Sequence, residues 1–422
     1  MKRTIVATVA LLMISLFAIP GSSLAQSPGP VKVGVLLPLT GVFAPNSQEA
    51  LDGFRLYMDE IGGTVSGRAI QIIVEDSEGK PDVGLTKAQK LVERDQVHLL
   101  MGFVSTPVAL AVQAYGRQKG IPMVVAADTG FSQLTMPGRF LNPYIFRFSH
   151  SGAMHSPAAA DWGYKEAKWR KVVTLTADYA GGLEVTGSFV RVFCHLGGQV
   201  IQELNPPLGS PDFAPYLAQI DRSADAVIAF TPGADGLRFG RQYAEFGLKE
   251  KLPLLDLAGQ ITFEPNLPQL GNSALGIYSS IHYAPAIDTP ENRKFVAAFK
   301  AKHKRTPFYG APDGYVGARA IVEALKTVGG NVEDKEKFMA ALKRVEFDSP
   351  KGHIRLDQFQ NVVQSQYIRK VERVGAELVN VPIKPYPNNS QFWTWTPEEY
   401  LKYPLITELK GKHTDCAKVL GK

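Results

Sequence analysis

Short apolar runs alternate with longer segments of helical period along the first 180 residues. Val31–Leu37 is a nearly continuous apolar run, of the kind that is buried on both faces in a parallel sheet. From Leu51 to Ile61 apolar residues recur at helical spacing, and two glycines then end the predicted helix. Further strands are predicted at 69–75, 97–102 and 121–126, with helices between them. The first third of the chain therefore reads as a strand–helix repeat.

The same alternation restarts after about Ser149. Strands are predicted at 171–176, 199–203, 226–231 and 252–257, again separated by helical segments. Two such sets joined by short loops indicate an α/β fold with two doubly wound parallel sheets, and a cleft between two sheets is the natural ligand site.

The last third of the chain changes character. A strand at 276–283 precedes predicted helices at 292–304 and 312–328, and 352–373 alternates like an antiparallel hairpin. From Gly375 onward the chain is rich in Pro, Asn and aromatic residues, so we expect it to wrap a surface.

Length and composition are consistent with two globular lobes. At 422 residues the chain exceeds one ordinary core, and 45% hydrophobic with 20% charged residues is typical of a folded globular protein. Residues 1–25 have the basic start, apolar run and small-residue site of a secretory signal peptide, with cleavage expected after Ala25. No later run of 18 apolar residues follows, so we expect an exported, soluble mature protein.

The charge balance argues against nucleic acid as a partner. The signal holds two of the 46 basic residues, so the mature balance is 44 − 40 = +4, against +6 for the precursor. This excess is scattered and forms no basic stripe with interleaved aromatics.

Cys194 and Cys416 are the only cysteines, and they lie far apart in the sequence. They could pair in an oxidising compartment, but two cysteines do not make a disulfide framework. We expect a buried free thiol at Cys194, with pairing as the alternative.

The most informative local signal is Gly102–Val108, which lies between a predicted strand and a predicted helix. Pro107 suits the first helical position, and Ser105 or Thr106 suits the cap. The free backbone N–H groups of such a helix start bind anions, typically a carboxylate. A plain helix cap without a ligand is the alternative interpretation.

Other strand-end loops belong to the same crevice if the topology is right. They are Thr40–Phe43 and Asp128–Gly130 in the first half, and Asp178–Gly182 and Thr231–Gly236 in the second. A single loop aspartate is usually a turn residue, and a glycine-rich turn alone is weak support for a site.

Motifs for catalysis are missing from the sequence. Ser77–Lys80 matches S-x-x-K in a polar turn but has no companion motif, so we interpret it as chance. There is no G-x-S-x-G, H-E-x-x-H or Walker A pattern. We expect His150 and His155 to be solvated or capping residues rather than metal ligands, and Trp393 and Trp395 to be packing anchors. Neither an enzyme activity nor a metal or cofactor is therefore expected.

Several motifs in order carry a resemblance to a known family. Val33–Gly41, followed by Ala50–Gly53, resembles the opening of the periplasmic leucine/isoleucine/valine-binding family of solute receptors for ABC importers. The likeness continues through Gly102–Pro107 and Asp178–Ala180 as far as Gly314, and so covers essentially all of the mature chain.

The resemblance implies the type I periplasmic binding protein fold, in which two Rossmann-like lobes are joined by a three-strand hinge. Crossings would lie near Phe148, Tyr283 and Pro350. Lobe one would comprise 31–148 plus 284–348, lobe two 149–283 plus 349–390, and 391–422 would form a C-terminal tail.

The resemblance also implies ligand contacts. Family members hold a ligand carboxylate with groups that match Ser105, Thr106 and Thr129, and amino-acid binders hold the ammonium with groups of which one matches Asp178. Here Gly181 and Ala234 replace bulky residues, which enlarges the pocket and makes the chain more similar to the branch that takes aromatic acids such as benzoate or phenylpropenoid acids. The possible aromatic liners are Phe43, Phe103, Tyr179, Tyr283 and Tyr309. The acids that could still meet an ammonium are Asp128, Asp235 and Asp313.

We therefore expect a monomeric, non-catalytic periplasmic binding subunit that captures a small carboxylate by lobe closure and presents it to an ABC permease in the inner membrane. Uptake of branched-chain or other amino acids is the alternative, and a ligand sensor for a membrane receptor would have the same pocket. A secreted hydrolase would need a nucleophile elbow that the sequence does not contain.

Overall fold

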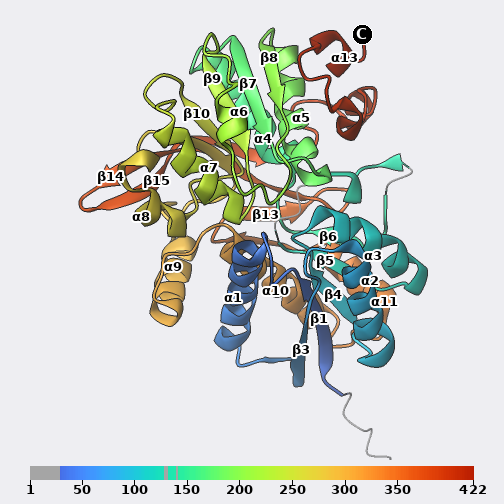
Figure 1. The fold of residues 1–422 in the computed structure, drawn as a ribbon. Helices are drawn as coiled ribbons and strands as arrows, with labels where there is room; N and C mark the ends of the chain where they lie inside the picture. Colours follow the sequence, from blue (N-terminus) through green and yellow to red (C-terminus); the bar gives the residue numbers. More distant parts are fainter. Residues whose placement is uncertain (1–28, 128–131, 139–140) are drawn as a thin grey trace, which may run out of the picture.

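The computed structural model describes residues 29–127, 132–138 and 141–422, which form two α/β lobes stacked one above the other (Figure 1). The predicted signal peptide, Asp128 and Thr129 lie outside the described residues. Within the described part, no helix combines the length and the apolar character needed to cross a bilayer.

The first sheet, which defines lobe one, has the order β2-β3-β1-β4-β5-β6. The central strand β1 (Val31–Leu37) pairs in parallel with both neighbours, and alternate side chains point to two separate cores because it is buried on both faces. The other strands are β2 (Thr64–Val65), β3 (Arg68–Asp76), β4 (Leu99–Gly102), β5 (Met123–Val125) and β6 (Ile145–Arg147).

Helices cover both faces of this sheet. Residues of α2 (Pro81–Gln89) and α3 (Thr106–Lys119) form the core on one face, and those of α1 (Ala44–Glu60) and α10 (Gly310–Thr327) the core on the other. Because Gly53 and Gly314 have no side chains, α1 and α10 approach closely: a Cβ on Gly53 would lie 1.8 Å from a carbonyl oxygen of α10. The remaining helices of lobe one are α9 (Pro290–His303) and α11 (Lys335–Lys343).

The second sheet has the order β12-β13-β14-β11-β10-β9-β7-β8, with β15 paired to β14, and its strands other than β12 and β13 define lobe two. β12 and β13 form a hairpin through which the chain passes from α11 of lobe one to β14 of lobe two. Five strands of this sheet run parallel: β7 (Lys171–Thr176), β8 (Gln199–Leu204), β9 (Ala226–Phe230), β10 (Leu254–Leu257) and β11 (Tyr278–Ile281). The antiparallel part consists of β12 (Glu346–Ser349), β13 (Gly352–Leu356), β14 (Val362–Val374) and β15 (Glu377–Asn389). Its helices are α4 (Gly152–Lys165), α5 (Ala180–His195), α6 (Ala214–Leu217), α7 (Ala234–Glu245) and α8 (Leu267–Leu270).

The α/β class with parallel sheets agrees with the sequence prediction, while four local features differ from it. The sequence pattern did not predict α4 or α11, and the helix expected at 213–222 shrinks to the single turn of α6. Of the segment after Gly375, which was expected to wrap a surface, Glu377–Asn389 instead form the strand β15.

The chain end packs on lobe two beside α5 (Figure 1). It includes α12 (Pro397–Tyr400) and α13 (Cys416–Val419), and Trp395 packs against the main core as an anchor. Cys194 of α5 and Cys416 form a disulfide with their Cα atoms 5.4 Å apart, so the expected free thiol at Cys194 is wrong. The fold joins the two residues across 222 positions of sequence.

Candidate functional site

Two helix starts from different lobes meet where the sheets face each other. In lobe one, α3 begins at Thr106 directly after the cap residue Ser105, and in lobe two, α5 begins directly after Tyr179. A Cβ on Gly181 would lie 2.9 Å from the Thr106 hydroxyl oxygen, so the two starts are in contact distance. Unsatisfied N–H groups and the positive ends of both helix dipoles therefore converge on one place.

A second contact closes the lobes at the start of α7. The backbone N–H of Ala234 donates a hydrogen bond of 3.2 Å to the carbonyl oxygen of Val42 in lobe one. Gly233 has φ +58°, and a Cβ there would lie 2.1 Å from the same oxygen. The structure is thus a closed arrangement of the lobes, and the closure depends on a glycine.

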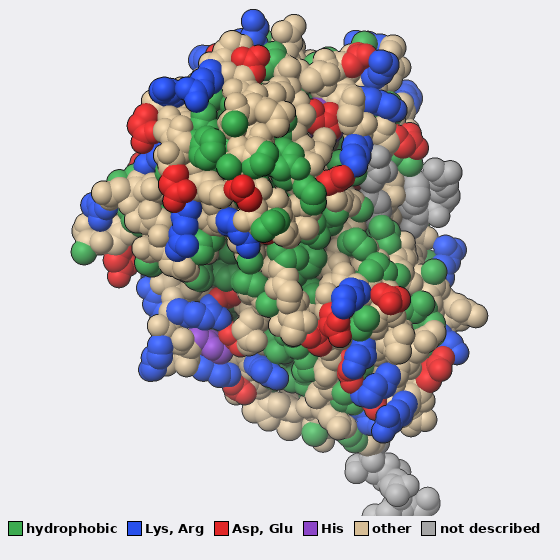
Figure 2. All heavy atoms as spheres, viewed as in Figure 1, with side chains coloured by type: hydrophobic (Ala, Val, Ile, Leu, Met, Phe, Trp, Pro, Cys, Tyr) green, Lys and Arg blue, Asp and Glu red, His purple; other side chains and the backbone are tan. Residues whose placement is uncertain are grey.

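Aromatic rings line the same interface. The rings of Phe43 and Tyr179 lie 6.0 Å apart across the lobes, and Tyr179 stacks on Phe230 at 6.4 Å. Figure 2 shows apolar side chains gathered along the band where the lobes meet, with charged side chains scattered over the outer surfaces. Phe230 was missed from the sequence, although its place as the last residue of a buried strand was the available signal.

A buried polar group completes the interface. The Nδ2 of Asn46 donates to the Tyr309 hydroxyl at 2.9 Å, and Gln260 of lobe two donates to the same hydroxyl. Gln260 Oε1 in turn accepts from the backbone N–H of Gly233 at 3.0 Å. Asn46 and Gln260 have no motif around them, so sequence reasoning missed both.

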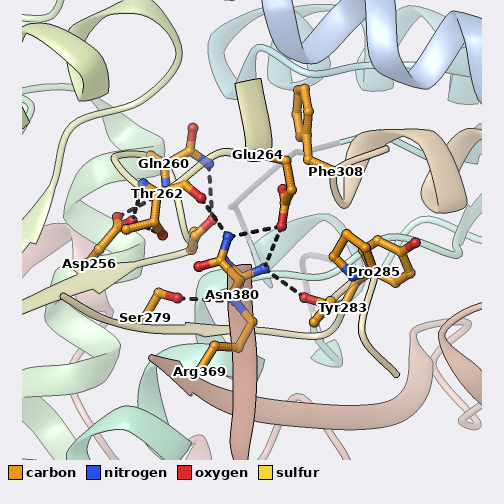
Figure 3. Close-up of polar contacts among 12 residues, drawn as sticks. Asp256, Gln260, Thr262, Glu264, Ser279, Tyr283, Pro285, Phe308, Arg369 and Asn380 are labelled. Carbon is orange, nitrogen blue, oxygen red and sulfur yellow. Dashed lines mark hydrogen bonds and ion pairs between the residues drawn. The ribbon is translucent and has the colours of Figure 1, made fainter. Parts of the chain in front are cut away.

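The Asp256 carboxylate fixes the conformation of the loop that carries Gln260 (Figure 3). Asp256 accepts hydrogen bonds from the backbone N–H groups of Gln260, Ile261 and Thr262 at 2.9, 3.0 and 2.9 Å. Burial raises the pKa of Asp256 to about 6, against these hydrogen bonds, which lower it. The turn is tight because residues 258–259 both have φ near +60°.

Below this loop lies the buried guanidinium of Arg369 (Figure 3). It donates to Ser279 Oγ at 3.1 Å and to the carbonyl oxygen of Tyr283 at 2.9 Å, and it lies 3.7 Å from the Glu264 carboxylate. A Cβ on Gly259 would lie 2.3 Å from this guanidinium. The arginine therefore supports the loop and does not itself reach the interface.

The structure brings together some of the sequence-predicted site residues and separates others. Those at the lobe interface are Phe43, Ser105, Thr106, Tyr179, Gly181, Ala234 and Tyr309. Phe103 instead lies in the core between the first sheet and its α2–α3 face. Tyr283 is fully buried at the hinge, and its carbonyl faces Arg369.

Three of the four predicted aspartates already have cationic partners. Asp178 pairs with Lys410 of the chain end at 2.7 Å, Asp235 with Arg238 at 2.8 Å and Asp313 with Lys351 at 2.6 Å. Asp235 also accepts from the backbone N–H of residue 209 at 2.7 Å, and burial raises its pKa. The fourth, Asp128, lies outside the described residues.

The expectation that His150 and His155 are solvated or capping residues was wrong. Both are fully buried, with their rings 5.1 Å apart. In the described part of the chain, His150, His282 and Asp313 form the group with ligand atoms close enough to hold a metal, within 4.8 Å of one another. The Lys351 ammonium already balances Asp313, so the donor set does not fit a divalent cation.

A hollow of about 570 Å³ lies beside the interface, between α9 of lobe one and α8 with the β14–β15 hairpin of lobe two. Lys300, Arg373 and Glu377 are among its lining residues, and none of the sequence-predicted site residues is. It is therefore separate from the strand-end loops.

Comparisons with known proteins agree with this architecture. The profile of the periplasmic binding protein family matches residues 30–376. Leu/Ile/Val-binding protein homolog 6 of Brucella melitensis is 33% identical over 378 residues, which cover 86% of this chain and 93% of that protein.

Solved structures show the same similarity. An ABC transporter substrate-binding protein from Sphaerobacter thermophilus is 37% identical with a TM-score of 0.81, covering 86% of this chain and 99% of that one. A solute-binding protein from Rhodopseudomonas palustris BisB5 in complex with 3,4-dihydroxybenzoic acid is 35% identical with a TM-score of 0.81, covering 86% and 98%. The chain therefore belongs to the periplasmic binding protein family, the substrate-binding components of ABC transporters.

Proposed function

We propose that this protein captures a small aromatic carboxylate between its two lobes in the periplasm and delivers it to an ABC permease. The observation that carries the proposal is the composition of the lobe interface. It offers helix N-termini and hydroxyls for an anion and rings for an apolar body, while three of the four candidate acids are already paired.

The carboxylate would be held at the start of α3. Ser105 and Thr106 are both buried, and the N–H groups of the first turn of α3 have no carbonyl partner within the helix. The Ser105 hydroxyl donates to the carbonyl oxygen of Gly79 at 3.3 Å and would turn from it to the ligand. A hydrogen bond to a charged group contributes about 1.5–3 kcal/mol, and a helix dipole adds about 0.3–1 kcal/mol. Free energies of this size are large enough for an anion to bind in preference to a neutral molecule.

The ring of the ligand would pack against the aromatic residues that the two lobes bring together. Phe43 comes from lobe one, and Tyr179 and Phe230 come from lobe two. Aromatic pairs in offset or edge-to-face geometry contribute about 0.5–1.5 kcal/mol beyond the buried area. Because Gly181 has no side chain, Tyr179 and Thr106 can both lie close to it: an added Cβ would lie 2.7 Å from the Tyr179 ring and 2.9 Å from the Thr106 hydroxyl oxygen.

An amino acid is the less favoured ligand because its ammonium needs a free acid. To use Asp178, Asp235 or Asp313, the ammonium would have to displace Lys410, Arg238 or Lys351. The buried group at the interface is the neutral amide of Gln260 beside the hydroxyl of Tyr309.

The relatives support the same ligand class. Besides the complex with 3,4-dihydroxybenzoic acid, a solute-binding protein of an ABC transporter from Rhodopseudomonas palustris in complex with benzoate is 30% identical, with a TM-score of 0.79. A leucine-binding protein from Thermotoga maritima, at 21% identity, shows the fold alone.

Binding would act through lobe closure, since a ligand held by both lobes favours the closed state. A ligand shifts such an equilibrium only by its differential affinity, and moving it from 1:99 to 99:1 takes about 5.5 kcal/mol. In the closed state the lobes touch at Gly233 and Gly181, and the permease would bind a surface to which both lobes contribute.

The test compares 3-phenylpropanoate with phenylalanine, which differ only in the ammonium group, and adds two benzoates and leucine. We expect 3-phenylpropanoate, benzoate and 4-hydroxybenzoate to raise the melting temperature by mass action, and phenylalanine and leucine to leave it unchanged. Calorimetry would give the affinities, and mass spectrometry of the released ligand should recover it unaltered. Tighter binding of phenylalanine or leucine than of every aromatic acid would refute the proposal.

A further inference from the structure

The three connections between the lobes meet at one buried carboxylate, that of Asp313. It accepts from Lys351 Nζ at 2.6 Å and bonds to His282 Nε2 at 2.9 Å, and His150 Nδ1 lies 3.7 Å away. All four side chains are fully buried. Asp313 lies in the first turn of α10, so the carboxylate itself belongs to lobe one.

Each of its three partners comes from a different connection. His150 lies between β6 and α4, and His282 directly follows β11. Lys351 lies in the turn of the β12–β13 hairpin, which joins α11 of lobe one to β14 of lobe two. Lys351 also donates to the carbonyl oxygen of Phe148 at 2.8 Å, which ties the third connection to the first. We call these residues, Asp313, His150, His282 and Lys351, the hinge cluster.

The charges of Asp313, His282 and Lys351 balance one another without a further ion. Burial alone would raise the pKa of Asp313, but the charges and hydrogen bonds of its neighbours hold it well below its usual range. Burial lowers the pKa of Lys351 and lowers that of His282 to about 3, so His282 is neutral at pH 7. Asp313 and Lys351 therefore form a buried ion pair, and removing one partner is strongly destabilising because the other charge is left buried and uncompensated.

The hinge cluster is also in contact with the ligand interface. The Tyr309 ring lies 5.3 Å from the His150 ring and 5.7 Å from the His282 ring. The hydroxyl of the same tyrosine bonds Asn46 of lobe one and Gln260 of lobe two. One side chain therefore separates the point where the connections meet from the point where the lobes close.

We propose that Asp313 is a positioning residue for lobe closure: it holds the three connections at one point, about which the lobes turn. This inference rests on the lobe closure of the proposed function and not on the identity of the ligand. His155, whose ring is 5.1 Å from that of His150, also faces the cluster, and burial keeps its pKa well below the ordinary value.

The main test separates positioning from simple stabilisation. Asp313→Asn leaves a buried ammonium unpaired, while the double variant Asp313→Asn/Lys351→Met removes both charges and should recover most of the unfolding free energy. Small-angle scattering without ligand reports the range of lobe orientations, and calorimetry with 4-hydroxybenzoate reports affinity. Asp288→Asn, which removes an exposed charge paired with Arg293, is the matched control.

We expect the double variant to fold like the wild type yet to sample a wider range of orientations and to bind about tenfold more weakly, since the competent state is less populated. Recovery of stability, scattering profile and affinity together would overturn the proposal and leave a structural ion pair.

If the double variant does not fold, His282→Phe is the second test. It removes one hydrogen bond to Asp313 and should change the scattering profile in the same direction, and an unchanged profile would also overturn the proposal. If the wild type does not bind 4-hydroxybenzoate, the proposed ligand fails, while the scattering measurement still tests the hinge.

Discussion

The two edges of the cleft are built from different residue types. The edge of lobe one carries the hydroxyls of Ser105 and Thr106 at a helix start. The edge of lobe two carries the ring of Tyr179 and the glycines Gly181 and Gly233. The edge of lobe one is therefore suited to binding a charged group, and the edge of lobe two to packing around an apolar one.

This difference indicates an order of events. Charge-assisted hydrogen bonds are directional and contribute more per contact than ring packing, so a carboxylate can dock on lobe one alone. The contacts of lobe two form only on closure, because Ala234 reaches Val42 across the cleft. Lobe one would select the ligand class, and lobe two would select among its members.

The largest effect is expected from the edge of lobe one. Ser105→Ala with Thr106→Ala removes two hydroxyls, each worth about 1.5–3 kcal/mol toward a carboxylate, and should weaken benzoate binding by at least a hundredfold. Calorimetry checks this, with Thr86→Ala on the exposed face of α2 as the control. Unchanged affinity would remove both residues from the site.

The next effect concerns closure at the edge of lobe two. In Gly233→Ala the new Cβ would lie 2.1 Å from the Val42 oxygen, and overpacking of this kind costs about 1–3 kcal/mol. We expect benzoate affinity to fall about tenfold to a hundredfold by calorimetry. Gly247→Ala is a matched control, since Gly247 also has positive φ, +63°, but has no atom within 4 Å of the added Cβ. Equal losses in both variants would attribute the effect to backbone strain and not to closure.

A smaller effect is expected at the ring of lobe two. Tyr179→Leu keeps apolar volume but removes the ring that faces Phe43 and Phe230, a loss of about 0.5–1.5 kcal/mol. Benzoate should bind up to about tenfold more weakly, while hexanoate, if it binds, should be unaffected. An equal loss for both ligands would show that the ring fills space without selecting aromatics.

The smallest effect is expected where the chain end meets the cleft edge. Lys410→Met frees the Asp178 carboxylate, and exposed ion pairs of this kind contribute about 0–1 kcal/mol. We expect thermal melting and benzoate affinity to stay nearly constant, and phenylalanine to gain a weak affinity because the Asp178 carboxylate is then free to meet its ammonium. If phenylalanine still does not bind, the Lys410–Asp178 pair is not what excludes amino acids.

Much of the fold was readable from the sequence because it is encoded locally. The apolar run Val31–Leu37 is a central strand, and Gly102–Val108 is a strand-to-helix turn with Ser105 in the cap position. By contrast, α4 was missed because it is buried almost all round and contains Pro157, so it has no amphipathic period. β15 was missed because its prolines argue against a strand, although an edge position tolerates them.

The site was only partly predictable for a related reason. Ser105, Thr106 and Tyr179 occupy strand ends, which the topology places at the cleft. Gln260 reaches the interface only because Asp256 folds its loop back, and Phe103 turns into the core at a residue with φ +68°. Neither outcome has a signature in the neighbouring residues.

The sequence by itself determined the strand–helix order, the lobe architecture and the helix start at Ser105 and Thr106, because hydrophobic period, caps and turns act over a few residues. Tertiary structure alone decided that Cys194 meets Cys416, that two histidines in a polar segment become buried, and that one carboxylate gathers three distant connections. These contacts join segments that are far apart in the chain, and a charge so deeply buried is stable only when the whole fold brings its partner to it.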